Sequence, residues 1–538
     1  MSDTQTRPLG AQISHMLKAR GVEVIFGIPG VHNQEMYRGI EEAGLTHVLA
    51  RHEQGAGFMA DGYARATGKP GVAYVITGPG LCNVMTPMGQ AYSDSVPVLV
   101  LSSCLDETAA RKGQLHQGIK GQLHQMKDQR AAAETVCDWS EVALTAPAAY
   151  QLIDRALTEF ASARARSKHI SVPIHLLEAE AAPAKPMSVS ATRPAGDPAQ
   201  IKALAQKLQA AQKPLFIFGG GAVGVQNTDA LLARWQAASM TTYAGRGIVS
   251  PDAPLHFGAC LARESSVDVI AQADLVIAVG TELAEVDMWH PELGHSGELV
   301  RIDIDPSVLA DPQAAGFVIL GDTAQVMSAL DAALPATGTA KGWTAAEVAK
   351  WCKRWRSEVD MERPGILAVV DAVKAATPEG TMVYSDMTQF AYAATEVWEM
   401  DRPGHWHHPY GFGPLGYATP AAIGGAIGRP GLPTLAIIGD YGFQYTVQEL
   451  GAAVELGLPL PIILWDNGKL GEIEDSMTRA QIAPNAVIAH NPDFCKLAEA
   501  YGANAVAPKS LAELPEVLAK AFRADRPTLI YLTPQTAV

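Results

Sequence analysis

Two polar turns in the last third of the chain have residue types that could hold a metal ion. The apolar run 434–438 leads into the sequence GDYG, which contains Asp440, and the run 460–465 leads into DNG, which contains Asn467. A carboxylate and an amide oxygen are hard ligands of the kind that Mg²⁺ prefers, together with backbone, water and phosphate oxygens. Each turn alone has a simpler interpretation, because Gly, Asp and Asn favour turns.

The spacing of the two turns favours the metal interpretation. Asp440 and Asn467 are 27 residues apart, with a helical pattern at 446–456 between them. That is about the length of one βαβ unit, so both side chains are expected at the carboxyl ends of neighbouring parallel strands, where α/β sheets bind ligands. Gly439 and Gly442 let backbone N–H groups approach a diphosphate at the start of the next helix.

The same alternation of apolar strands and helical patterns occurs in three blocks. The predicted strands are 22–26, 72–77, 96–102 and 170–175 in the first block, 214–218, 274–279 and 299–304 in the second, and 382–385, 434–438 and 461–465 in the third. Fully apolar strands between helices predict parallel sheets covered on both faces. The predicted fold class is α/β, with three doubly wound parallel-sheet domains at 1–182, 199–335 and 360–538, joined by Pro- and Ala-rich linkers.

Composition excludes several classes of protein. The 538 residues are 48% hydrophobic and 18% charged, with a net charge of −15, as expected of a large folded enzyme and not of a nucleic-acid binder. The longest apolar runs have the length of a strand, so no membrane span is expected. The N-terminus lacks the apolar region of a secretory signal, and the six cysteines contain no CxxC pair. We therefore expect a cytoplasmic protein.

At this point the sequence resembles the thiamin-diphosphate enzymes of the acetolactate synthase-like family. The two turns match that family's cofactor signature, and further matching motifs are RHEQGA (51–56), MADGYARATGKPGV (59–72), TGPG (77–80), GPLG (413–416) and TPAAIGGAIG (419–428). One departure is Tyr441, where the family carries a small residue. The resemblance implies that the three domains are pyrimidine-binding, central Rossmann-like and diphosphate-binding.

The resemblance also implies roles for residues at the cofactor rings. Glu53 would lie beside N1′ of the pyrimidine ring and act as the catalytic acid. The carbonyl of Gly413 would accept a hydrogen bond from the 4′-amino group, and Leu415 would wedge between the two rings. The predicted cofactors are thiamin diphosphate and Mg²⁺.

At the diphosphate end, the resemblance implies that Asp440, Asn467 and the main-chain carbonyl of Lys469 bind Mg²⁺. Gly439, Tyr441 and Gly442 would belong to the same cofactor-binding turn. Sites of this family form between the first block of one chain and the third block of another. A homodimer is therefore the minimum assembly, and a homotetramer is expected.

The middle block offers a weaker signal for a nucleotide. The turn GGGA (219–222) follows a strand, and Asp303 lies within the predicted strand 299–304. Some relatives bind FAD or another nucleotide in this domain, but GGGA lacks the full GxGxxG spacing. A purely structural middle domain is favoured, and a nucleotide site stays open as the alternative.

Three residues of the first block could face the substrate. Gln125 matches a glutamine that approaches the cofactor in acetolactate synthases, whereas His124 stands where those enzymes carry phenylalanine. His32 follows the first strand and, by resemblance, points toward the same cleft. A histidine there could donate to a substrate carboxylate or act in protonation. The alternative for His124 is a solvated loop histidine.

The segment GKLGEIEDSM (468–477) lines the substrate pocket in relatives, with Glu472, Ile473 and Ser476 expected to face inward. It carries three acids in four residues, beside a site for an anionic 2-oxo acid. A substrate with a cationic far end would explain them, because a carboxylate pairs bidentately with a guanidinium. The alternative is a solvated acidic helix start.

Together, these motifs look closest to the 5-guanidino-2-oxopentanoate (2-ketoarginine) decarboxylases. The expected function is the non-oxidative decarboxylation of this small-molecule 2-oxo acid to 4-guanidinobutanal and CO₂. The alternatives are a carboligase or lyase of the acetolactate synthase or benzaldehyde lyase type, and a non-catalytic paralogue.

Overall fold

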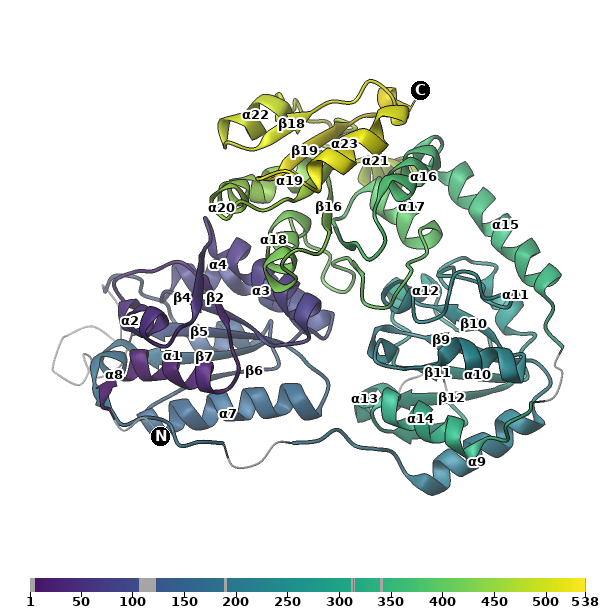
Figure 1. Cartoon of the computed structure of the whole chain (residues 1–538), viewed down its shortest axis with the longest axis horizontal. Helices are drawn as coiled ribbons and strands as arrows, with labels where there is room; N and C mark the ends of the chain where they lie inside the picture. The colour runs from purple at the N-terminus through teal and green to yellow at the C-terminus, as the bar shows by residue number, and fades with distance from the viewer. Residues whose placement is uncertain are drawn as a thin grey trace.

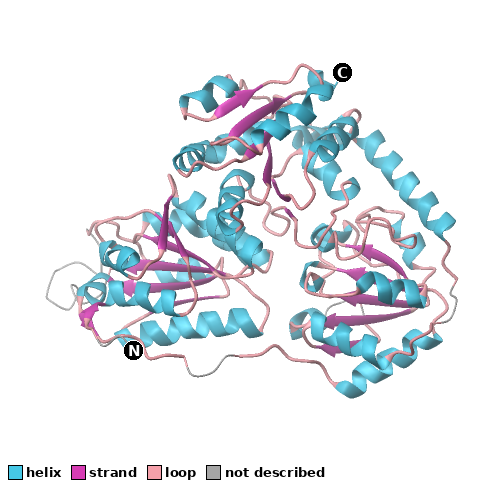
Figure 2. Cartoon of the chain, viewed as in Figure 1, coloured by secondary structure: helices cyan, strands magenta, loops and turns pink. Residues whose placement is uncertain are grey.

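Three parallel β-sheets, each with helices on both faces, organise the molecule (Figures 1 and 2). The computed structural model describes residues 5–105, 122–187, 191–310, 313, 315–338 and 342–537. The predicted fold class, three doubly wound α/β domains, is confirmed. In the part of the chain that the structure describes, no helix is long and apolar enough to cross a lipid bilayer.

The first sheet has six parallel strands in the order β3-β2-β4-β5-β7-β6. Its strands are β2 (Val24–Gly27), β3 (Thr46–Leu49), β4 (Gly71–Val75), β5 (Val98–Cys104), β6 (Trp139–Val142) and β7 (Lys168–Pro173). Its helices are α1 (Leu9–Ala19), α2 (Gln34–Glu42), α3 (Glu53–Thr67), α4 (Pro79–Ser93), α6 (Gln129–Glu134), α7 (Ala146–Ser162) and α8 (Ile174–Glu178). A short antiparallel pair joins β1 (Arg7–Pro8) to β8 (Glu180–Ala181). The strand order changes direction between β2 and β4, and ligands of α/β sheets bind at such a switch point.

The strand predicted at 170–175 is too long at its C-terminal end. Strand β7 stops at Pro173, and the apolar residues that follow form helix α8. Pro173 takes the N-cap position of that helix, with φ −55° and ψ 139°. Because the apolar run continues from the strand into the helix, the sequence pattern does not mark the boundary.

The second sheet has five parallel strands in the order β10-β9-β11-β12-β13. They are β9 (Pro214–Phe218), β10 (Ala238–Thr241), β11 (Leu275–Val279), β12 (Glu298–Asp303) and β13 (Phe317–Leu320). The helices are α9 (Pro198–Ala210), α10 (Thr228–Trp235), α11 (Ser266–Ile270), α12 (Glu285–Met288), α13 (Pro306–Leu309) and α14 (Thr323–Ala333), with 3₁₀ turns η1 (Gly220–Ala222) and η2 (Tyr243–Gly245). The amide of Gly221 donates to the carbonyl of Gly280 at 2.9 Å, and a Cβ atom on Gly219 would lie 2.4 Å from the same oxygen. Close contact between two loops therefore accounts for these glycines without a nucleotide.

The third sheet has six parallel strands in the order β15-β14-β16-β17-β19-β18. They are β14 (Met382–Ser385), β15 (Trp406–His407), β16 (Thr434–Gly439), β17 (Pro461–Trp465), β18 (Asn504–Val506) and β19 (Thr528–Leu532). The helices are α15 (Ala345–Glu362), which leads in from the middle domain, α16 (Ile366–Ala376), α17 (Gln389–Val397), α18 (Ala418–Gly428), α19 (Asp440–Thr446), α20 (Leu450–Glu455), α21 (Gly471–Arg479), α22 (Phe494–Ala500) and α23 (Leu514–Ala521), with 3₁₀ turns η3 (Val447–Glu449), η4 (Leu511–Glu513) and η5 (Pro534–Ala537). Here the strand order changes direction between β14 and β16.

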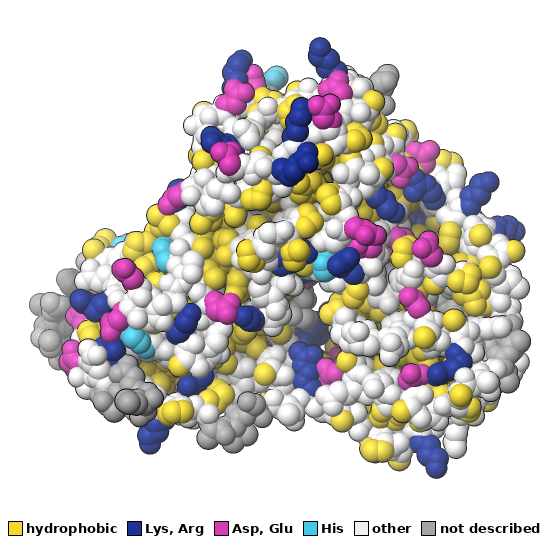
Figure 3. Space-filling model, viewed as in Figure 1, with side chains coloured by type: hydrophobic (Ala, Val, Ile, Leu, Met, Phe, Trp, Pro, Cys, Tyr) yellow, Lys and Arg dark blue, Asp and Glu magenta, His cyan; other side chains and the backbone are white. Residues whose placement is uncertain are grey.

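Helices α3 and α18 bring the first and third domains into direct contact. A Cβ atom on Gly62 would lie 1.9 Å from the carbonyl oxygen of Ala421, and one on Gly424 would lie 1.9 Å from that of Met59. The side chains around this crossing form one hydrophobic core that includes residues of both domains. The middle domain has hydrophobic clusters of its own. On the face drawn in Figure 3, acidic and basic side chains of the described residues are interspersed.

Candidate functional site

Glu53 lies at the switch point of the first sheet, as the first residue of helix α3. Its side chain is buried, and its Oε2 accepts a hydrogen bond of 2.9 Å from Asn83 Nδ2 on helix α4. A Cβ atom on Gly80 would lie 3.2 Å from Glu53 Oε1, so the absence of a side chain there lets the TGPG loop approach the carboxylate. The structure therefore brings the predicted acid to the loop that follows strand β4.

Two contacts fix the TGPG loop beside that acid. The amide of Gly78 donates to Gln129 Oε1 at 3.1 Å, and the amide of Thr77 donates to Ser103 Oγ at 3.1 Å. Gly78 has φ +67°, and a Cβ atom there would lie 2.5 Å from the carbonyl oxygen of His124. Both the backbone angle and the close contact require glycine at this position.

The two predicted histidines lie side by side at this edge. The ring centroids of His32 and His124 are 4.9 Å apart, edge to face. Burial and the neighbouring His124 both lower the pKa of His32, which favours its neutral form. Its buried Nδ1 makes no hydrogen bond to the residues that the structure describes. Gln125 is exposed on the same loop.

The predicted metal ligands lie at the carboxyl ends of β16 and β17. The two strands are paired with Gly439 opposite Trp465, so Asp440 and Asp466 follow at the same level of the sheet. Asn491 Nδ2 donates to Asp440 Oδ2 at 2.7 Å and to Asp466 Oδ1 at 2.9 Å.

The chemistry of this group suits a cation. Burial, reinforced by the Asp466 carboxylate, raises the pKa of Asp440 to about 6. A bound cation favours the ionised form of such a carboxylate. Among the described residues, no set of three His, Cys, Asp or Glu side chains could hold a metal ion by itself. Amide, backbone and phosphate oxygens would therefore have to complete the ligand set, as is common for Mg²⁺.

Asn467 lies next to this pair and contacts the start of helix α17. Its Nδ2 donates to Gln389 Oε1 at 3.0 Å, and its Oδ1 accepts from the amide of Lys469 at 3.3 Å. Lys469 is held by a backbone bridge to Ile488 and by an ion pair with Glu474. Helices α17 and α19 both begin at this edge, and helix N-termini favour anions such as a diphosphate.

The GPLG loop is held by a buried carboxylate, Asp386. Its oxygens accept hydrogen bonds from the amides of Met387 at 2.7 Å and Gly416 at 2.8 Å. Burial raises the pKa of Asp386 to about 7 although these amides lower it. Gly413 has φ +67°, and a Cβ atom on it would lie 2.9 Å from Met387 Cε. The half-buried Leu415 is part of this restrained loop.

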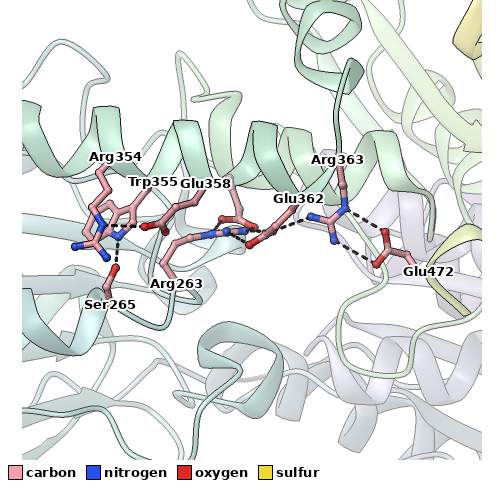
Figure 4. Close-up of polar contacts among 9 residues, drawn as sticks. Arg263, Ser265, Arg354, Trp355, Glu358, Glu362, Arg363 and Glu472 are labelled. Carbon is pink, nitrogen blue, oxygen red and sulfur yellow. Dashed lines mark hydrogen bonds and ion pairs between the residues drawn. The ribbon is translucent and has the colours of Figure 1, made fainter. Parts of the chain in front are cut away.

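Glu472 lies in a cavity of about 1130 Å³ between the middle and C-terminal domains. Its Oε1 and Oε2 accept from Arg363 Nε at 3.1 Å and Nη2 at 3.3 Å (Figure 4). Met387, which contacts the GPLG loop, lines the same cavity, so the cavity reaches the cofactor-side edge of the sheet. Ile473 and Ser476 are exposed on helix α21 and do not line this cavity.

A further carboxylate, Glu449, joins the C-terminal domain to the helix that carries Glu53. It is fully buried and accepts from the amides of Arg51 at 3.1 Å and His52 at 2.9 Å. A Cβ atom on Gly55 would lie 2.3 Å from its Cδ. Burial raises the pKa of Glu449 to about 7, and the charge of Glu53 raises it further, while the two amides lower it.

Sequence reasoning missed five residues that hold the predicted ones in place: Asn83, Asp386, Gln389, Glu449 and Asn491. Asp386 follows strand β14 as directly as Asp440 follows β16, so the strand-end argument could have found it, and Gln389 comes three residues later at the start of α17. The other three reach the site from positions distant in sequence. No local pattern marks such contacts.

Comparison with known proteins identifies the class of enzyme to which this arrangement belongs. The chain matches three parts of the thiamine pyrophosphate enzyme family: the N-terminal TPP binding domain over residues 7–130, the central domain over 201–330 and the C-terminal TPP binding domain over 386–532. The chain belongs to this family, which confirms the resemblance seen in the sequence, and its cofactor is thiamin diphosphate.

Individual relatives cover nearly the whole chain. It is 43% identical to the probable 2-ketoarginine decarboxylase AruI of Pseudomonas aeruginosa, across 99% of this chain and 95% of the relative. It is also similar to acetolactate synthases. The enzyme of Mycobacterium bovis is 29% identical, across 92% of this chain and 82% of that protein, and the isozyme 2 large subunit of Escherichia coli is 27% identical, across 97% and 95%.

The raised pKa of Glu449 predicts a pH-dependent stability. An acid with a pKa of about 7 in the folded chain, against an ordinary value of 4.5, contributes stability that is complete below pH 4.5 and is lost as the pH rises through 7. Glu449→Gln cannot titrate. The melting temperature of the wild type relative to this variant should therefore fall between pH 5 and 8 and level off above.

The control for this comparison is Glu455→Gln, which removes an exposed carboxylate that also contacts Arg51. The difference in melting temperature between this variant and the wild type should stay constant across the same pH range. A parallel curve for Glu449→Gln would show that Glu449 does not carry the raised pKa.

Proposed function

We propose that the chain is a thiamin-diphosphate- and Mg²⁺-dependent decarboxylase that converts 5-guanidino-2-oxopentanoate to 4-guanidinobutanal and CO₂. The observation that carries the proposal is the Glu472 carboxylate, which accepts a planar guanidinium with both oxygens in a cavity that reaches the cofactor-side edge of the sheet. Such a carboxylate suits the far end of this substrate. The similarity to a probable 2-ketoarginine decarboxylase over nearly the whole chain supports the same substrate.

At the pyrimidine end, we propose that Glu53 shares a proton with the cofactor ring, since its buried carboxylate lies beside the TGPG loop. The carbonyl of Gly413 and the side chain of Leu415 would hold the cofactor in its bent form. The hydrogen bonds that Asp386 makes to Met387 and Gly416 support these roles, because they restrain the GPLG loop. When bound, thiamin diphosphate supplies the electron sink that loss of CO₂ from a 2-oxo acid needs.

At the diphosphate end, we propose that Mg²⁺ is bound by the side chains of Asp440 and Asn467 and by the carbonyl of Lys469. Gly439, Tyr441 and Gly442 would shape the same turn. The raised pKa of Asp440 supports this proposal, because a cation would compensate the buried negative charge.

Next to the reacting carbons, the imidazole N–H of His32 would donate a hydrogen bond to the substrate, or its protonated ring would donate a proton, with His124 and Gln125 beside it. The unpartnered, buried Nδ1 of His32 supports a role of this kind. Ile473 and Ser476 would reach the substrate only where a second subunit covers the exposed face of α21.

We propose that each site forms between two chains, with Glu53 and Asp440 from different subunits of a cytoplasmic homodimer or homotetramer. Glu53 contacts Asn83 near the start of helix α4, whereas the amide of Gly411, next to the GPLG loop, donates to Asp94 at its end. At 1.5 Å per residue these points lie roughly 16 Å apart. This separation supports a site in which the acid and the GPLG loop that hold one cofactor come from different chains.

Exposed apolar side chains near the site support the proposed assembly of subunits. Val31, Phe412, Ile473 and Ile488 are large, exposed apolar side chains on the loops and helix that carry the proposed site residues. A second subunit would cover such side chains.

No disulfide joins any of the six cysteines, all of which the structure describes, as is typical of a reducing compartment. We also propose that the three domains span residues 1–182, 199–335 and 360–538.

Glu53→Gln should lower CO₂ release from the preferred 2-oxo acid about 100-fold or more, because general acid–base catalysis is worth that much. The variant should still bind thiamin diphosphate, measured by quenching of tryptophan fluorescence. Full turnover in a variant that binds the cofactor normally would rule out this role for Glu53.

Asp440→Asn should raise the Mg²⁺ concentration needed for half-maximal activity about 10-fold or more, since one of the few charged ligands is lost. Asp475→Asn removes an exposed acid of the same region and should leave the Mg²⁺ requirement unchanged. A wild-type enzyme that keeps its activity after exhaustive treatment with a chelator would contradict the metal site.

The substrate is tested with three 2-oxo acids of similar length that end in a guanidino, a ureido or a methyl group. The wild type should prefer the guanidino acid, and Glu472→Gln should raise its KM about 10-fold while changing the KM of the ureido acid little. Product analysis then separates the alternatives. Aldehyde and CO₂ support the decarboxylase, whereas acetolactate or acetoin from pyruvate would identify a carboligase, in keeping with the acetolactate synthase relatives.

A further inference from the structure

A row of alternating carboxylates and guanidinium groups runs along the wall of the cavity that contains Glu472. Its members, in the order of their ion pairs, are Glu396, Arg263, Glu362, Arg363 and Glu472, and we call them the charge ladder. Figure 4 labels the last four of them. Helices α15, α17 and α21 and the segment before α11 contribute to it. The charge ladder has three acids and two bases, so it carries one net negative charge and ends in a carboxylate on both sides.

The contacts within the charge ladder differ in closeness. Arg263 forms close paired contacts with both oxygens of Glu396 and contacts Glu362 at 2.6 and 3.1 Å. Arg363 contacts Glu472 at 3.1 and 3.3 Å. The terminal pair is therefore the loosest of the bidentate pairs. Met387, which lies beside the GPLG loop, lines the same cavity as this pair.

Arg363 has a second carboxylate within reach. Its Nη1 donates to Glu362 Oε2 at 3.3 Å, and its guanidinium carbon lies 5.8 Å from the ring centroid of Tyr392. Releasing Glu472 would therefore not leave a buried guanidinium without a counter-charge, which is the costly outcome when an ion pair is broken. Glu472 lies in the first turn of α21, where the helix dipole stabilises a negative charge without Arg363.

We propose that Arg363 is an internal competitor for the substrate: it occupies the guanidinium position on Glu472, and the guanidino end of the substrate displaces it toward Glu362. This inference rests on the proposed function and adds a specificity-determining residue to it. The exchange replaces one bidentate guanidinium–carboxylate pair by another. Displacing Arg363 therefore costs a guanidino substrate little binding free energy.

The exchange makes the site selective among 2-oxo acids. A substrate tail that cannot form two charge-assisted hydrogen bonds has two ways to bind. It displaces Arg363 and makes a weaker interaction with Glu472 than the one it breaks, or it binds without reaching Glu472. Arg363 also lowers the apparent affinity for every guanidinium ligand, because the ligand binds only to the fraction of molecules in which Glu472 is accessible. The apparent dissociation constant is the intrinsic one divided by that fraction. Removing Arg363 should therefore tighten the binding of guanidinium ligands, whereas a residue that merely orients Glu472 would have the opposite effect.

The test uses the cofactor-loaded enzyme and two variants, Arg363→Met and the matched control Arg354→Met. Arg354 lies on the same helix and lines the same cavity, but its partner is Glu358 on its own helix. Arg363→Met should lower the KM of the guanidino 2-oxo acid, and the inhibition constant of propylguanidine, about 3-fold or more. Arg354→Met should change neither, and it should also leave the KM of the ureido acid within about 2-fold of the wild-type value.

Arg363→Lys is a second variant, which tests the exchange even where Arg363→Met does not fold. Lysine keeps the charge but lacks the planar fork, so it competes less well for both oxygens of Glu472. It should change the propylguanidine constant in the same direction by a smaller factor. An unchanged or higher constant in both folded variants would overturn the exchange.

Glu472→Gln separates failure of this inference from failure of the proposed function. If Glu472→Gln abolishes the preference for the guanidino acid but the Arg363 variants bind propylguanidine no more tightly, only the exchange is wrong. If the wild type shows no preference for the guanidino acid, the proposed substrate is wrong, and the inference fails with it.

Discussion

The close crossing of helices α3 and α18 is the constraint on which the arrangement of the chain depends. Because Gly62 and Gly424 have no side chains, the two backbones touch, and the first and third domains share one hydrophobic core. Helix α3 begins at Glu53, and its preceding amides are capped by Glu449 of the third domain. The position of the proposed acid is therefore set by contacts between domains as much as by its own sheet.

Electrostatics explain why this region is built from so many buried carboxylates. Burial raises the pKa of Asp386, Asp440 and Glu449, and each is surrounded by amide donors that offset part of the cost. Asp386 and Glu449 use those donors to restrain loops and helix starts. Asp440 differs from them, because it faces Asp466 at the end of a neighbouring strand. A site that brings two carboxylates together is suited to a cation, whereas the other two are suited to holding backbone.

The sequence was sufficient to predict the features that depend on local order along the chain. Apolar strands and the turns after them predicted three parallel sheets, and the strand-end rule placed Asp440 and Asn467 together because adjacent parallel strands end at one edge. The strand predicted to reach residue 175 was too long, since the apolar run continues into α8. The partner of Glu472, Arg363, lies 109 residues away in the sequence, and no periodicity encodes such a contact.

In the proposed exchange, the partly buried ion pair of Arg363 and Glu472 acts as a recognition element. Replacing such a pair by apolar side chains is often neutral or stabilising, so stability alone does not explain five charged side chains along one cavity wall. An alternating row in which Glu362 serves two guanidinium groups can pass an arginine from one carboxylate to the next without leaving either unpaired. Selectivity for a guanidinium would then arise from an exchange between equal partners, and the protein itself would supply the competitor that excludes neutral tails.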